Sequence, residues 1–168
     1  MSKAIAFLFV LAIVTTNTVA HAQSGCAYQR EGFKTKLSDT RPAVWSNENG
    51  LTHSVTLSNG IQMEFSAIGC EHYGEGYHFL HIKNFPAYDD ANFFSTVRQY
   101  IKLVPFKETA NKQQLLIFTN ELEVALKADK LSWQKSSSGN ILQLDKTDYS
   151  FSIEITSTQL NLDYQGYY

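Results

Sequence analysis

The sequence predicts an α+β fold, in which an antiparallel sheet carries two helices on one face in the order β-β-β-α-α-β-β-β. Three observations support this prediction. A hairpin signal lies near residue 58, two apolar stripes at helical spacing occupy the middle of the chain, and apolar and polar residues alternate strictly near the C-terminus. Strands grouped on either side of a pair of helices are typical of this class.

The first two strands are expected at residues 52–57 and 61–68, joined by the loop Ser58-Asn59-Gly60. A three-residue loop pairs Leu57 with Ile61, which places two apolar side chains on the same face of the sheet. A two-residue turn would instead pair apolar residues with polar ones. The three-residue loop is therefore the predicted connection.

The same register makes further predictions along the hairpin. Val55 lies opposite Met63, and His53 lies opposite Phe65 on the apolar face. We interpret His53 as a partly buried residue with satisfied hydrogen bonds rather than a ligand. Gly60 falls where such a loop requires a left-handed backbone.

The third strand is predicted at 76–82, after a glycine-rich loop at 69–76. We expect residues 71–77 to form an exposed binding edge, since loops held by a rigid scaffold often carry binding residues. An ordinary connecting loop is the alternative. The candidate binding residues are Glu71, His72, Tyr73, Glu75 and Tyr77.

Two helices are expected next. Asp89 or Asp90 caps the first and Pro105 ends it. The second runs from Thr109 to about Lys130. Residues at three- and four-residue spacing form their buried faces, and these are Phe93, Phe94, Val97, Tyr100, Ile101 and Val104 in the first helix and Leu115, Phe118, Leu122, Ala125 and Leu126 in the second.

The C-terminal part is predicted to be strands. Residues 131–135 are a candidate short strand, residues 136–140 are a turn, and residues 141–145 are a strand. Beyond these, apolar residues alternate with polar ones in two half-buried strands, at Tyr149, Phe151, Ile153 and Ile155 and then at Leu160, Leu162 and Tyr164.

Residues 1–22 have the features of a secretory signal peptide. Lys3 supplies a basic start, residues 4–14 are apolar, and Ala20-His21-Ala22 is a small-residue cleavage site. We therefore expect export to the periplasm or secretion, from a cell of bacterial type, and a single domain at 23–168. No membrane span is expected, because the apolar segment is too short.

Two cysteines, Cys26 and Cys70, remain in the mature chain, and in an oxidising compartment we expect them to form a disulfide. Closing a loop of about 44 residues contributes about 4 kcal/mol on chain-entropy grounds. A lipid anchor is not expected, because Gln23 stands where a lipoprotein signal requires an aliphatic residue. Residues 23–50 are predicted to be irregular, because turn signals are frequent there.

Charge excludes one class of partner. Without Lys3 the chain holds 13 basic and 16 acidic residues, a net charge of −3, and no basic patch is present. Nucleic-acid binding is therefore not expected.

One cluster could carry chemistry, since Glu71, His72, Glu75, His78 and His81 lie close in sequence. Histidines and carboxylates bind zinc or act as acids and bases, and the metal candidates are His72, His78 and His81. The spacing matches no known metal or catalytic motif. Hence no metal, cofactor or catalytic residue is assigned.

These observations favour a small exported protein that recognises another protein, as an inhibitor or an immunity-type protein. The alternatives are a small hydrolase that uses the Glu71–His81 cluster, with or without zinc, and a carrier of small molecules or glycans. The missing catalytic motifs and the aromatic residues near the glycine-rich loop support the binding protein.

Overall fold

The computed structural model describes residues 37, 44–47, 50–68 and 72–167. The predicted signal peptide at 1–22 lies outside the described residues. So do Cys26, Cys70 and Glu71, and the expected disulfide therefore stays a prediction.

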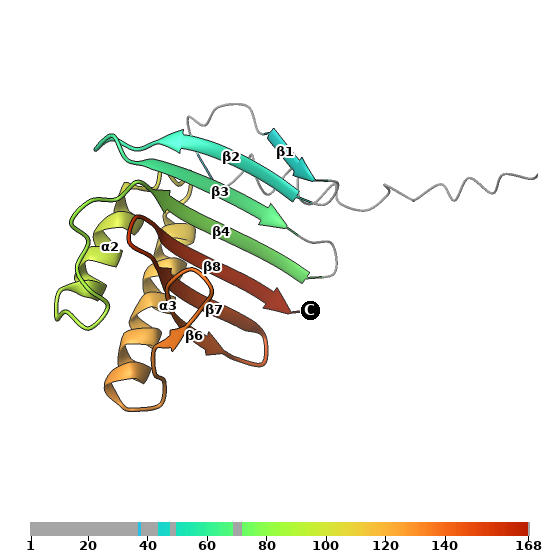
Figure 1. The fold of residues 1–168 in the computed structure, drawn as a ribbon. Helices are drawn as coiled ribbons and strands as arrows, with labels where there is room; N and C mark the ends of the chain where they lie inside the picture. The colour runs from blue at the N-terminus through green and yellow to red at the C-terminus, as the bar shows by residue number, and fades with distance from the viewer. Residues whose placement is uncertain (1–36, 38–43, 48–49, 69–71, 168) are drawn as a thin grey trace, which may run out of the picture.

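The described strands form one antiparallel sheet in the order β1-β2-β3-β4-β8-β7-β6-β5. Two helices, α2 (Phe93–Leu103) and α3 (Thr109–Lys127), connect β4 to β5 and lie on the same face of the sheet (Figure 1). The predicted α+β class is confirmed. The strands are β1 (Val44–Asn47), β2 (Gly50–Thr56), β3 (Gln62–Ile68), β4 (His72–Leu80), β5 (Gln134–Lys135), β6 (Asn140–Asp145), β7 (Tyr149–Ile155) and β8 (Leu160–Tyr167).

The chain enters the sheet at one edge and returns to its centre. Strands β1 to β4 follow one another as a meander, and β5 to β8 form a second meander that begins at the opposite edge. Strand β8 therefore pairs with β4 in the middle of the sheet. The pairing brings residues near 78 beside residues near 163, far apart in the sequence.

The predicted hairpin is confirmed. His53 lies opposite Phe65 and Val55 opposite Met63, and the N–H of Leu57 donates to the carbonyl of Ile61 at 2.8 Å. Gly60 has a φ of 81°, the left-handed conformation that the loop requires.

The predicted helices are confirmed with small changes at their ends. Helix α2 begins after Asn92, whose N–H donates to the Asp90 carboxylate at 2.7 Å, and helix α3 ends at Lys127. Their apolar stripes pack against the sheet. The Phe118 ring stacks on Tyr164, with ring centroids 5.2 Å apart.

Two predictions about strand boundaries are wrong. Residues 44–47 form strand β1 within the segment that was expected to be irregular. Strand β4 begins at His72 rather than at residue 76. Glycines at 74 and 76 are therefore strand residues here, and the turn they suggested does not exist.

The two faces of the sheet differ sharply. The face toward the helices holds the core, whose largest fully buried side chains include Tyr77, Phe65, Phe79, Phe93 and Phe151. The helices cover this face only (Figure 1). We call the other side the open face.

Candidate functional site

The open face is polar across its whole centre. Side chains alternate along a strand, so the residues between the buried positions point to this side. Fifteen such positions lie along the middle of β3, β4, β8, β7 and β6, while Leu80 and Tyr167 lie on the same side at the ends of β4 and β8. The fifteen are Gln62, Glu64 and Ser66; Gly74, Gly76 and His78; Asn161, Asp163 and Gln165; Ser150, Ser152 and Glu154; and Ile141, Gln143 and Asp145.

The face is also acidic. Four of these positions are carboxylates, namely Glu64, Asp145, Glu154 and Asp163, and none of the fifteen positions holds a lysine or an arginine. Such a face attracts cations and repels phosphate.

A histidine and an aspartate form an ion pair at the centre of the face. His78 Nε2 lies 2.9 Å from Asp163 Oδ1, across the β4–β8 pairing. Gly76 makes this possible. A Cβ atom at Gly76 would lie 2.7 Å from His78 Nε2 and 2.8 Å from Asp163 Oδ1, too close for any side chain to coexist with the pair.

The surroundings favour the charged form of His78. Burial alone would lower its pKa, but the hydrogen bond to Asp163 and the negative charges of Asp163, Glu64 and Glu154 outweigh burial and raise the pKa above 6.5. His78 therefore carries more positive charge near neutral pH than an ordinary histidine.

Glu154 lies on the open face at the same height along the strands as the ion pair. It accepts hydrogen bonds from the hydroxyls of Ser136 and Ser138 and from Asn161 Nδ2 at 3.1 Å. These bonds, that of Ser136 first, lower the pKa of Glu154 despite its partial burial. Glu154 thus adds a fixed negative charge to the open face.

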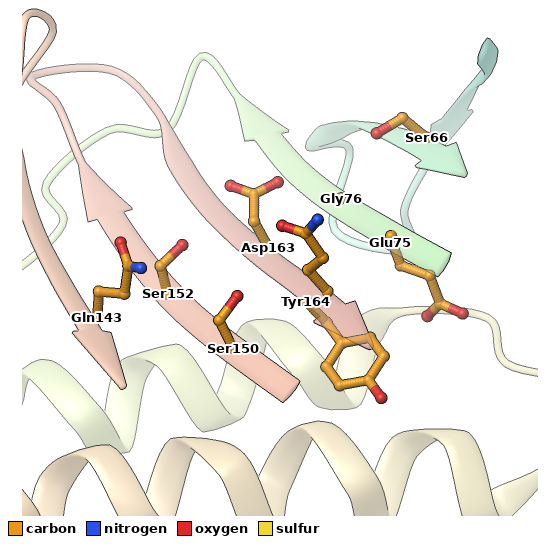
Figure 2. A pocket seen from close by; sticks show the side chains of 10 residues that line it. Ser66, Glu75, Gly76, Gln143, Ser150, Ser152, Asp163 and Tyr164 are labelled. Atoms are coloured by element: carbon orange, nitrogen blue, oxygen red, sulfur yellow. The ribbon is translucent and has the colours of Figure 1, made fainter. Parts of the chain in front are cut away.

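Beside the ion pair the open face has a shallow hollow of about 350 Å³. Figure 2 shows Ser66, Gln143, Ser150, Ser152 and Asp163 on the side of the sheet away from the helices. By register, Gln165 joins them from β8. Gly74 and Gly76 form the floor, because they place no side chain between the neighbouring strands.

The groups around the hollow have unused hydrogen-bonding capacity. Within the described part of the chain, the hydroxyls of Ser66, Ser150 and Ser152 and the amide of Gln165 make no side-chain hydrogen bond, and Asp163 Oδ2 accepts none. Gln143 donates to Asp145 at 2.8 Å and keeps its carbonyl oxygen available. The hollow offers acceptors and hydroxyls to a polar ligand.

The predicted exposed binding edge is wrong for residues 73–77, and Glu71 lies outside the described residues. Tyr73, Glu75 and Tyr77 lie in β4 and point to the covered side, with exposed fractions of 8%, 7% and 1%. The tyrosine hydroxyls donate to the Glu75 carboxyl, that of Tyr77 at 2.6 Å. Burial, and then the nearby Tyr73, raise the pKa of Tyr77 well above its usual value, so its hydroxyl keeps the proton that it donates.

The described members of the histidine and carboxylate cluster do not converge. Glu75 and His78 lie on opposite faces of the sheet, and His81 is exposed beyond the end of β4 with a φ of 55°. His72 and His78 are six residues apart along one strand, which is about 20 Å. Within the described part of the chain, no three such side chains come together as a metal site.

Most residues of the open face were not predicted from the sequence. The sequence did contain a signal for them. In the two C-terminal strands polar residues alternate with apolar ones, and the polar positions include Ser150, Ser152, Asp163 and Gln165. Their partners could not be identified without the β4–β8 pairing.

No helix within the described residues combines the length and apolar character needed to cross a membrane. No protein-family model, curated protein or solved structure matches the chain. The site is therefore interpreted from its own geometry.

Proposed function

We propose that the chain is a small exported binding protein, periplasmic or secreted, that recognises another protein through the open face. An inhibitor or immunity-type role fits such a protein. The observation that carries the proposal is the hollow, since the Ser152 hydroxyl, the Gln165 amide and Asp163 Oδ2 surround it without hydrogen-bond partners in the described part of the chain. A surface with unused donors and acceptors on a rigid sheet is suited to specific recognition.

The alternatives have less support. A hydrolase that uses the Glu71–His81 cluster would need Glu75 and His78 on one face, and they lie on opposite faces. A carrier needs a pocket that encloses its ligand, mostly with apolar and aromatic walls. The hollow is shallow and polar, and the nearest tyrosine, Tyr164, points to the helix side (Figure 2).

Affinity capture tests the proposal. The mature chain, immobilised, is exposed to the envelope and secreted fractions of its source cell and of competing cells, and retained proteins are identified. We expect a partner whose binding is lost in Gln165→Tyr, which fills the hollow. Gln113→Tyr, at an exposed position of α3, is the matched control and should bind normally.

Two outcomes would contradict the proposal. One is a partner that binds Gln165→Tyr as well as the unchanged chain, because the open face would then not be the interface, and loss of binding in Gln113→Tyr would place the interface on the helix side. The other is the absence of any retained protein combined with turnover of a peptide, ester or peptidoglycan substrate.

Export makes a separate prediction about the cysteines. In an oxidising compartment, Cys26 and Cys70 should form a disulfide. Titration of the denatured, unreduced protein should find no free thiol, and two free thiols per chain would contradict the prediction.

A further inference from the structure

We propose that the occupant of the hollow is an arginine side chain from a basic segment of the partner protein, paired with Asp163. The inference rests on the proposed function and adds the chemistry of the partner. It follows from the charge of the open face, the state of Asp163 and the arrangement of acceptors around it.

Charge comes first. The open-face strand positions include four carboxylates and no lysine or arginine, whereas the whole chain has 14 basic and 16 acidic residues. The excess of negative charge is therefore local to this face. A partner with positive charge would be steered to it.

Asp163 has capacity for a second cation. Its side chain is 48% exposed and His78 occupies only Oδ1, at 2.9 Å. The pair spans β4 and β8, so His78 also restrains the Asp163 carboxylate where it lines the hollow. A restrained carboxylate loses less side-chain entropy when a ligand binds.

The neighbouring acceptors suit a guanidinium group. Ser152 lies directly opposite Asp163 in the β7–β8 register, and Gln143 lies opposite Ser152 in the next pair. Adjacent strands are about 4.8 Å apart, so the acceptors form a row across the hollow. Arginine presents five N–H donors in a planar fork and can bond to several acceptors at once, whereas lysine presents a single compact ammonium group.

The floor of the hollow leaves room for such a side chain. Gly74 and Gly76 of β4 keep the space between Ser66 and Asp163 free of side chains other than the His78 ring. A volume of about 350 Å³ accommodates one long side chain but not a folded element. The remaining binding energy would come from the surrounding polar face.

Hexaarginine amide is the test probe. Its binding to the mature chain is followed by calorimetry and by amide chemical shifts in NMR, at about 0.05 M and about 0.15 M salt, across which screening increases. We expect shifts confined to the strands that line the hollow, β3, β4, β8, β7 and β6, and weaker binding at the higher salt concentration. Hexaglutamate and maltohexaose should not bind.

Asp163→Asn and Asp129→Asn form a matched pair of variants with the same change in net charge. Asp129 follows α3, is exposed and has a φ of 55°, a conformation that asparagine adopts readily. Asp163→Asn should weaken hexaarginine binding by about three- to fivefold, as expected for a partly exposed ion pair. Asp129→Asn should leave it unchanged.

Equal weakening in both variants would overturn the inference, because net charge alone would then explain binding. Shifts on α3, or equal binding of maltohexaose, would also overturn it. If hexaarginine does not bind but capture of the natural partner is lost in Gln165→Tyr, this inference fails and the proposed function stands. If Gln165→Tyr captures the partner normally, the proposed function itself fails.

Discussion

Replacing Gly76 with alanine should break the His78–Asp163 ion pair while leaving the fold intact. The added Cβ would lie 2.6 Å from Ser66 Oγ, 2.7 Å from His78 Nε2 and 2.8 Å from Asp163 Oδ1, whereas ordinary contact begins at 3.4 Å. The two atoms of the pair must each move by about 0.6 to 0.7 Å to relieve the contacts, by subtraction of these distances. A hydrogen bond of 2.9 Å does not survive such a displacement.

The energetic cost should be small. All three atoms end side chains that can turn toward solvent on the open face, and a partly exposed pair contributes about 0.2 to 1 kcal/mol. Alanine recovers about 0.5 to 1 kcal/mol relative to glycine within a strand. We therefore expect the free energy of unfolding to change by less than about 1 kcal/mol.

The specific readout is the pKa of His78, measured by NMR titration of its ring protons. Gly76→Ala should lower this pKa toward 6.5, because the contacts with Asp163 raise it in the unchanged protein. Gly166→Ala is the control. The three atoms nearest to its Cβ would all belong to Tyr164, at 3.0 Å or more, and the pKa of His78 should stay unchanged. An unchanged pKa in Gly76→Ala, or loss of more than about 3 kcal/mol of stability, of the order seen for a core defect, would refute the reasoning.

Three further predictions concern stability. Phe118→Ala removes a buried ring from the contact of α3 with the sheet, and it should lower the free energy of unfolding by about 3 to 5 kcal/mol in urea denaturation. As a control, Val124→Ala on the exposed side of α3 should change the free energy of unfolding by less than about 0.5 kcal/mol. Tyr77→Phe removes the 2.6 Å hydrogen bond to the buried Glu75 carboxyl and should lower the free energy of unfolding by about 1 to 3 kcal/mol. A free energy of unfolding equal to that of the unchanged protein would show that this bond does not contribute to stability. Because the pKa of His78 is raised on folding, the contribution of His78 to stability is full below pH 6.5 and is lost as the pH rises through the folded-state pKa. His78→Gln should remove this part of the pH dependence of the free energy of unfolding.

The sequence was sufficient where local pattern and register decide the structure. The pairing of His53 with Phe65 followed from requiring apolar residues on one face, and the stripe around Phe118 followed from helical spacing. Both rules use neighbours within about ten residues. They do not depend on how distant strands come together.

The failures around the glycine-rich segment and the open face share one cause. Gly74 and Gly76 were interpreted as loop residues, but both lie in strand β4. Gly76 is needed there because the His78 ring and Asp163 occupy the space where its Cβ would lie. His78 and Asp163 are separated by 85 positions in the sequence. Their meeting depends on β8 returning to the centre of the sheet, which no local pattern reveals.

The most direct test of the central claim is an NMR map of the binding surface with the captured partner. Amide shifts of the labelled mature chain are followed as the unlabelled partner is added. If the open face is the binding surface, the largest changes should fall on Gly74, Gly76, Ser152 and Asp163, with little change along α3. Large changes along the exposed side of α3, around Gln113 and Val124, with an unaffected open face would contradict the account.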